Sequence, residues 1–172
     1  MILTSLEPED LDLLYTIENN PSLWSVSSSN VPYSRYALRD YIATQQHDIY
    51  ADKQVRLVAR VEETDADGVE TKAVGLVDLF NFSPENLRAE IGIAILAEEQ
   101  HKGYGKEAVR QLLNYAREVL HLHVVYAIVP EDNTSSISML RATGFSQTAM
   151  LKDWILRGDG WYDAIYLQII LQ

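Results

Sequence analysis

The most informative stretch of the sequence is Gln100-His101-Lys102-Gly103-Tyr104-Gly105-Lys106, which follows a predicted strand and begins the most regular predicted helix. Glycines at such a turn let backbone N–H groups face an anion, and the positive end of the following helix attracts the same charge. Lys102 and Lys106 add mobile positive charge in a chain that is otherwise acidic. The stretch therefore predicts a pyrophosphate-binding turn, and the alternative is a glycine-rich turn that only starts a helix.

Two common nucleotide-binding patterns do not match this turn. A dinucleotide-binding fold places three glycines after its first strand, with an acidic residue about 20 residues later. Here the turn lies in the middle of the chain, and Ala108 occupies the third glycine position. A P-loop requires Ser or Thr directly after its lysine, and Lys106 is not followed by either. A different fold must therefore present this turn.

The elements around the turn predict a mixed sheet with helices on its faces. The helix expected at 104–120 carries an apolar stripe at helical spacing, and residues 124–129 form a nearly continuous apolar run, typical of a strand covered on both faces. The sequence Asp65-Ala66-Asp67-Gly68 is a hairpin signal. Further strands are expected at 2–6, 55–61, 73–80, 88–96, 147–156 and 161–171, and further helices at 7–18, 34–46 and 135–142, the helix at 34–46 with Tyr33, Ala37, Tyr41 and Ile42 facing inward.

The composition indicates one acidic domain over residues 1–172. A formal net charge of −11 repels phosphate backbones, so nucleic acid is not expected as a partner. The chain has no cysteine, and His121 and His123 have no evident third ligand, so no metal is expected. We find no signal peptide and no apolar run near the ~20 residues of a membrane span, so a cytoplasmic protein without membrane contact is expected. The serine-rich residues 25–30 are either a flap over a site or a loop.

Two signatures in the expected order give the chain a resemblance to the GNAT superfamily of N-acetyltransferases, over about residues 74–172. The first signature is Gln/Arg-x-x-Gly-x-Gly/Ala after a strand, and the second is Asn-x-x-Ser/Ala followed by a helix and Gly-Phe. The matching residues are Gln100, Gly103, Gly105, Asn133, Ser136, Gly144 and Phe145.

The resemblance implies an α/β (α+β) GNAT fold, with a central mixed, mostly antiparallel twisted sheet of about seven strands and four helices on its faces. It implies acetyl-CoA as cosubstrate, held in part by the backbone of a strand that is splayed from its neighbour. Backbone donors of this kind act as an oxyanion hole. The residues that the resemblance assigns to acetyl-CoA are Ile93, Ala94, Ile95, Gln100, His101, Lys102, Gly103, Tyr104, Gly105, Lys106, Asn133 and Ser136.

The resemblance also places a general base at Glu90, at the start of the central strand. An acceptor amine with a pKa of about 10.4 arrives charged and must lose a proton before it attacks. The alternative is that Glu90 only caps the strand and pairs with Arg88 or a lysine. Leu140 occupies the position of the tyrosine that usually protonates the thiolate, so Ser136, Ser138, another tyrosine or a water must supply that proton.

Within the superfamily, the chain is most similar to bacterial spermidine/spermine N-acetyltransferases, through 74–78, 89–90, 100–105 and 160–164. The expected substrate is a polyamine or other small primary amine, attacked directly in a ternary complex. Acetylation of protein N-termini, as in ribosomal-protein N-acetyltransferases, and a non-catalytic acyl-CoA sensor are the alternatives. The relatives also imply a possible homo-oligomer.

Overall fold

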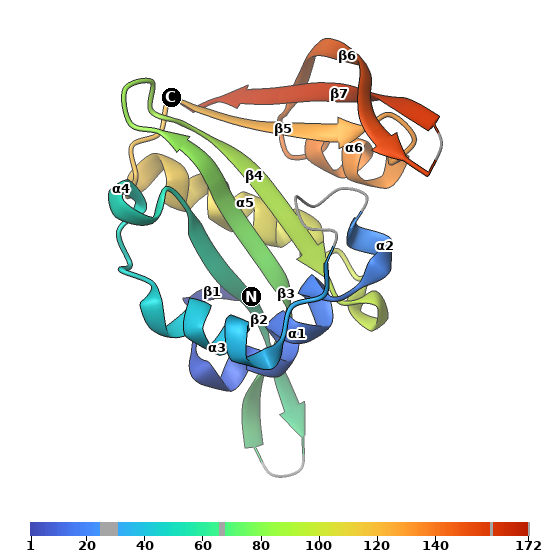
Figure 1. The fold of residues 1–172 in the computed structure, drawn as a ribbon. Coiled ribbons are helices and arrows are strands. Elements are labelled where there is room, and N and C mark those ends of the chain that lie inside the picture. Colours follow the sequence, from blue (N-terminus) through green and yellow to red (C-terminus); the bar gives the residue numbers. More distant parts are fainter. Residues whose placement is uncertain (25–30, 66–67, 159, 172) are drawn as a thin grey trace.

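The computed structural model describes residues 1–24, 31–65, 68–158 and 160–171 (Figure 1). Within these residues, seven strands form one sheet in the order β1-β2-β3-β4-β5-β7-β6. Neighbouring strands are antiparallel except β4 and β5, which are parallel, so the mixed sheet expected from the sequence is confirmed. The strands are β1 (Ile2–Ser5), β2 (Val55–Asp65), β3 (Gly68–Ser83), β4 (Arg88–Ile95), β5 (Val124–Pro130), β6 (Ser146–Arg157) and β7 (Gly160–Ile170).

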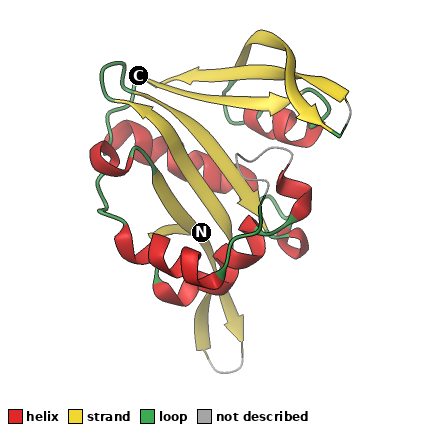
Figure 2. Cartoon of the chain, in the orientation of Figure 1, coloured by secondary structure: helices red, strands yellow, loops and turns green. Residues whose placement is uncertain are grey.

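Four helices of eight residues or more lie in the described parts of the chain, as expected, and they cover the sheet (Figure 2). They are α1 (Leu11–Glu18), α3 (Arg35–Thr44), α5 (Tyr104–Glu118) and α6 (Thr134–Arg141). The short helices η1 (Pro8–Asp10), α2 (Pro21–Trp24), α4 (Ile49–Asp52) and η2 (Ala97–Glu99) join these elements.

Three of the short helices, α2, α4 and η2, were missed by the sequence analysis because single turns carry little periodicity. No helix was expected between residues 19 and 33, yet Pro21 begins α2, since proline suits a first helical position. The Asp48 side chain caps α4 by accepting a hydrogen bond from the Tyr50 N–H, and Lys53 ends that helix in the left-handed conformation. Local capping therefore forms turns that an apolar pattern does not reveal.

The buried side chains form two clusters, one on each face of the sheet. The cluster against α5 includes Val109, Leu112 and Val125, and the cluster against α1 and α3 includes Leu14 and Leu38. Because strand residues alternate between faces, β2, β3 and β4 contribute to both clusters. The β4 strand thus sends Ala89 and Ile91 toward α5 and Ala94 toward α1 and α3.

The inward face of α3 differs from the expectation. Tyr33 and Ala37 are exposed, whereas Leu38 and Ile42, four residues apart, are buried. Tyr33 lies before the helix, where its backbone N–H donates to Asn19 Oδ1 at 2.7 Å. The expectation is confirmed for Ile42 and for the half-buried Tyr41, and it was wrong for Ala37, which lies about 100° around the helix from Leu38.

The flap or loop predicted at 25–30 and the tip of the 65–68 hairpin lie outside the described residues. The hairpin itself is present, since Asp65 pairs with Gly68. No helix in the described ranges is both long and apolar enough to cross a membrane.

Candidate active site

The two parallel strands of the sheet share only a short stretch of pairing. Residues 88–90 of β4 pair with residues 124–126 of β5, and the strands then diverge (Figure 1). The outer edge of β4 pairs with β3, and the outer edge of β5 pairs with β7. The facing edges of residues 91–95 and 127–130, which we call the open seam, therefore carry backbone groups that lack a strand partner and can bind a ligand.

The glycine turn lies at the wide end of the open seam. Gly103 has a φ of 84° and precedes the first residue of α5, whose first N–H groups have no partner within the helix. A Cβ at Gly105 would lie 3.6 Å from Ile93 Cδ1 and 3.1 Å from Met139 Sδ, so the start of α5 packs closely between β4 and α6. Gln100 Nε2 donates to the Ile95 carbonyl at 3.1 Å and ties the turn to β4. This geometry fits a pyrophosphate at the helix N-terminus.

The two lysines of the turn have different surroundings. Lys102 Nζ lies 2.9 Å from the buried carboxylate of Glu99, which also contacts Lys72 at 2.7 Å. Hydrogen bonds from Lys102 and Lys72 lower the pKa of Glu99, so Lys102 is engaged in a charge cluster. Among the described acids, none lies within ion-pair distance of Lys106. Lys106 is therefore the lysine whose charge is available to an anion.

Glu90 occupies the last paired position before the strands diverge, beside Tyr126 on β5 and Phe80 on β3. Its Oε2 accepts a hydrogen bond from Asn81 Nδ2 at 2.9 Å. Burial raises the pKa of Glu90, and hydrogen bonds from Asn81, the Tyr126 hydroxyl and the Ile128 backbone amide oppose that rise. The carboxyl group is thus half-buried at the narrow end of the open seam, with neutral hydrogen-bond donors around it.

The alternative role of Glu90 as an ion-paired strand cap does not match these contacts. No described cation lies within ion-pair distance of its carboxylate, and Arg88 is exposed on the same strand. A half-buried carboxyl group with a raised pKa, held by neutral donors, is instead typical of a general base.

The residues of the second signature lie at the start of α6. Asn133 Oδ1 accepts a hydrogen bond from the Ser136 N–H at 3.1 Å, so Asn133 caps this helix. Leu140 is 3% exposed and belongs to the core cluster against α5. Ser136 is half-buried and Ser138 is exposed on the same helix. The side chain of Leu140 therefore contributes packing at the usual tyrosine position.

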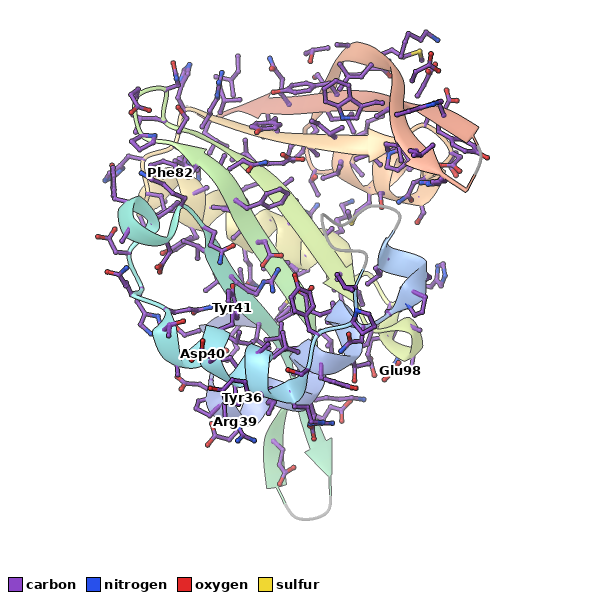
Figure 3. The ribbon with its side chains drawn as sticks, in the orientation of Figure 1. Tyr36, Arg39, Asp40, Tyr41, Phe82 and Glu98 are labelled. Carbon is purple, nitrogen blue, oxygen red and sulfur yellow. The ribbon has the colours of Figure 1, made fainter. Side chains whose placement is uncertain are left out.

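A second charged cluster lies on the α1 and α3 face of the sheet. Arg56 Nε donates to Asp78 Oδ1 at 2.7 Å, and its Nη1 lies 2.6 Å from Glu18 Oε1. The guanidinium carbon is 5.6 Å from the centre of the Tyr41 ring, which lies on the sheet side of α3, whereas Tyr36 lies on the exposed side (Figure 3). Burial opposes the charge of Arg56, but Asp78, Tyr41 and Glu18 raise its pKa overall. The cluster keeps one net negative charge.

This cluster and Glu90 share one face of β4. A Cβ at Gly92 would lie 3.4 Å from Asp78 Oδ2 and 3.2 Å from the Phe80 ring. Gly92 and Glu90 are two residues apart in the strand and therefore lie on the same face. Two other acids, Asp78 and Asp163, both have cationic partners, Arg56 and Lys152. Glu90 therefore has a different environment from either of these acids.

Sequence reasoning missed three contributors to the site, namely Asn81, Tyr126 and Arg56. A signal for the first exists, because asparagine is rare within strands and Asn81 interrupts Phe80 and Phe82. Pairing between distant strands places Tyr126 beside Glu90 and Arg56 beside Asp78, and such pairing leaves no local signal.

The described residues contain no group of three or more His, Asp or Glu side chains that could hold a metal ion. A cavity of about 130 Å³ lies at the start of β2, lined by residues such as His47, Asp52 and Tyr115. Glu90 does not line this cavity, so it is separate from the open seam.

Comparison with known proteins identifies the family of the chain. The family model described as "Acetyltransferase (GNAT) domain" matches residues 1–146. The spermidine N(1)-acetyltransferase of Escherichia coli (strain K12) is 30% identical over 159 residues, which cover 91% of this chain and 79% of the relative. The crystal structure of spermidine N-acetyltransferase from Vibrio cholerae in complex with CoA and spermine has a TM-score of 0.81 and 25% identity, over 98% of this chain and 94% of that chain.

A further structure of the Vibrio cholerae enzyme, described as dodecameric, has a TM-score of 0.77 and 25% identity, over 98% of this chain and 92% of that chain. The family match spans most of the chain, and the structural match spans nearly all of it. The chain belongs to the GNAT acetyltransferase family and is an N-acetyltransferase with the fold of the bacterial spermidine N-acetyltransferases.

Proposed function

We propose that this chain transfers an acetyl group from acetyl-CoA to a polyamine or other small primary amine, by direct attack in a ternary complex. The observation that carries the proposal is the placement of Glu90 at the narrow end of the open seam, with the anion-binding turn at the wide end. A thioester held along the seam would meet a base at one end and a phosphate site at the other.

The residues have distinct roles in this proposal. The turn at 100–106 holds the pyrophosphate through backbone N–H groups and Lys106, and Asn133 and Ser136 contact the coenzyme arm. The N–H groups of residues 93 and 95, which face away from β3, polarise the thioester carbonyl as donors of an oxyanion hole. Acetyl-CoA, when bound, supplies the reactive thioester.

Glu90 takes the proton that the amine must lose, directly or through a water. General bases work best when their pKa lies near the working pH, and burial raises the pKa of Glu90 in that direction. The carboxylate is active only when it is ionised, so activity is lost as the pH falls through its pKa. Ser136 and Ser138 are our candidates for protonating the leaving thiolate.

Three features support a cationic acceptor. The chain has a formal net charge of −11, and such a field draws cations toward the protein. The cluster of Arg56, Asp78 and Glu18 keeps one net negative charge on the face that Glu90 shares. The relatives that match over most of the chain include enzymes named for spermidine, one of them solved in complex with CoA and spermine.

The test is thiol release from acetyl-CoA, measured with spermidine, spermine, amino acids and short peptides for the wild type, Glu90→Gln and Glu118→Gln. Glu118 is an exposed acid at the end of α5 and serves as the matched control. We expect turnover on a polyamine, a fall in kcat/KM of about 100-fold or more in Glu90→Gln, and wild-type activity in Glu118→Gln.

The other outcomes separate the alternatives. Turnover only on peptides would indicate that the acceptor is a protein N-terminus. CoA binding without any turnover would support an acyl-CoA sensor, an alternative suggested by the apolar Leu140 at the usual tyrosine position. Full activity of Glu90→Gln would contradict the role of Glu90 as the base.

We also propose that the chain self-associates through the β6–β7 hairpin. Trp154 is 55% exposed and Trp161 is 60% exposed, and Leu156 pairs across the hairpin with Trp161. β6 is an edge strand, and an exposed apolar edge is suited to an interface. Light scattering coupled to gel filtration should show an oligomer that Trp154→Ser/Trp161→Ser converts to smaller species, and a monomeric wild type would contradict the proposal.

A further inference from the structure

Asn81 has an unusual backbone conformation within β3. Its φ is 51°, in the left-handed region, and the pairing of β3 with β4 shifts register between Phe80 and Ser83. Asparagine is among the few residues besides glycine that adopt this conformation readily. The conformation therefore marks a β-bulge, and bulges are known to redirect side chains beside active sites.

The bulge changes the face on which Asn81 lies. In a regular strand, residue 81 would point to the face opposite that of Phe80. Instead, Phe82 joins the core cluster against α5, and Asn81 Nδ2 reaches Glu90 Oε2 at 2.9 Å on the Phe80 side. One extra residue in β3 thus delivers an amide donor to the Glu90 carboxylate.

The other ionisable side chains around Glu90 are two tyrosines and an arginine. Tyr126 on β5 and Tyr166 on β7 face it, and burial raises the pKa of both hydroxyl groups. The positive charge of Arg88 on β4 opposes that rise in the pKa of both tyrosines. Tyr126 and Ile128 also donate to the carboxylate. Among these groups, Glu90 is the one that titrates on the acid side.

We propose that Asn81 is a positioning residue that fixes the orientation of the Glu90 carboxylate and keeps it ionised at the pH of catalysis. The inference rests on the proposed role of Glu90 as the general base. A hydrogen bond to a carboxylate stabilises its charged form, and loss of that bond shifts ionisation toward higher pH. The left-handed bulge is the structural cost of placing this donor.

The test distinguishes the effect of the Asn81 side chain from the effect of the β-bulge. Asn81→Gly keeps a residue suited to φ of 51° and removes the amide, whereas Asn81→Asp keeps the size and replaces the donor with a second carboxylate. Lys53→Gly is the matched control, because Lys53 also has a left-handed φ, of 56°, at the end of α4. The profile of kcat/KM against pH is measured with saturating acetyl-CoA and one amine, so that titration of the amine affects all variants equally.

We expect Asn81→Gly to fold with a Tm at or above that of the wild type. On the acid side of the profile its kcat/KM should fall about tenfold, the effect of one lost hydrogen bond to a charged group. On the alkaline plateau its activity should return close to that of the wild type. Asn81→Asp should lose more on the acid side, because a neighbouring carboxylate disfavours ionisation of Glu90. Lys53→Gly should retain the wild-type profile.

Two results would overturn the inference. One is an Asn81→Gly profile identical to that of the wild type. The other is an equal loss of kcat/KM at every pH, which indicates that Asn81 affects only the conformation of the site. Glu90→Gln, measured in parallel, keeps the two proposals apart. If Glu90→Gln is fully active, the base assignment fails, whereas an inactive Glu90→Gln with an unchanged Asn81→Gly profile refutes only the role of Asn81.

Discussion

The two edges of β4 differ in one respect that explains the site. Along one edge β4 pairs with β3 from Ile95, opposite Gly75, to Arg88, opposite Ser83. Along the other edge it pairs with β5 for three residues and then separates. The closed edge holds the sheet together through backbone hydrogen bonds, and the open edge presents the same kind of groups to a ligand. A single strand can therefore serve as scaffold on one side and as binding site on the other.

The largest effect is expected at the closed edge, from Gly75→Val. A Cβ at Gly75 would lie 2.3 Å from the Ala94 carbonyl oxygen, a backbone atom that moves only if β3 and β4 separate. We expect the free energy of unfolding, measured with urea, to fall by about 3 kcal/mol.

Gly160→Ala is the control for this change, since its Cβ would meet the nearest atom at 3.5 Å, an ordinary contact. A loss in Gly75→Val no larger than in Gly160→Ala would show that the closed edge is not tightly packed.

A smaller effect is expected at the open edge, from Gly103→Ala. A Cβ at Gly103 meets nothing within 4 Å, so the cost arises only from the φ of 84°, at about 1–2 kcal/mol. We expect the turn to shift to relieve this strain, and the Kd for CoA, measured by calorimetry, to rise by roughly tenfold.

Gly158→Ala provides the comparison, because Gly158 also has a positive φ with no atom within 4 Å but lies in the β6–β7 hairpin. Equal weakening of CoA binding in both variants would show that the turn is not part of the CoA-binding site.

The smallest expected effect is the loss of folding stability that the half-buried, ionised Glu90 side chain causes. Burial raises its pKa in the folded state, so the fold favours the protonated form, and that contribution to stability is lost as the pH rises through the folded-state pKa. Glu90→Gln should therefore show a small gain in Tm over the wild type at pH 8 and a smaller gain at pH 4. A gain that increases toward pH 4 would contradict the raised pKa.

The sequence predicted the elements that carry strong periodic patterns. The helix expected at 104–120 matches α5 closely, and the strand expected at 124–129 matches β5. Both could be predicted because the apolar residues within each segment are the ones that the core buries. The expected signatures also lie where the family pattern places them, at the starts of α5 and α6.

Features that depend on distant strands could not be predicted from local residue patterns, and the splayed strand was expected only through the family resemblance. Nothing within the sequence of β4 shows which of its edges lacks a partner, since both edges use the same backbone. The pairing of Lys102 with Glu99 depends on the 3-10 turn of η2 and on Lys72 from β3. Asn81 could be noticed as a poor strand former, but its contact with Glu90 requires the register of β3 and β4.

The most direct test of the open seam is hydrogen exchange of the backbone, measured by mass spectrometry with and without acetyl-CoA. Peptides that cover 91–96 and 100–107 should exchange more slowly when acetyl-CoA is added, because the ligand satisfies their unpaired N–H groups. Peptides that cover 74–80, already paired within the sheet, should not change. Protection confined to other segments, with 91–96 unaffected, would contradict the account of β4 as the strand that holds the thioester.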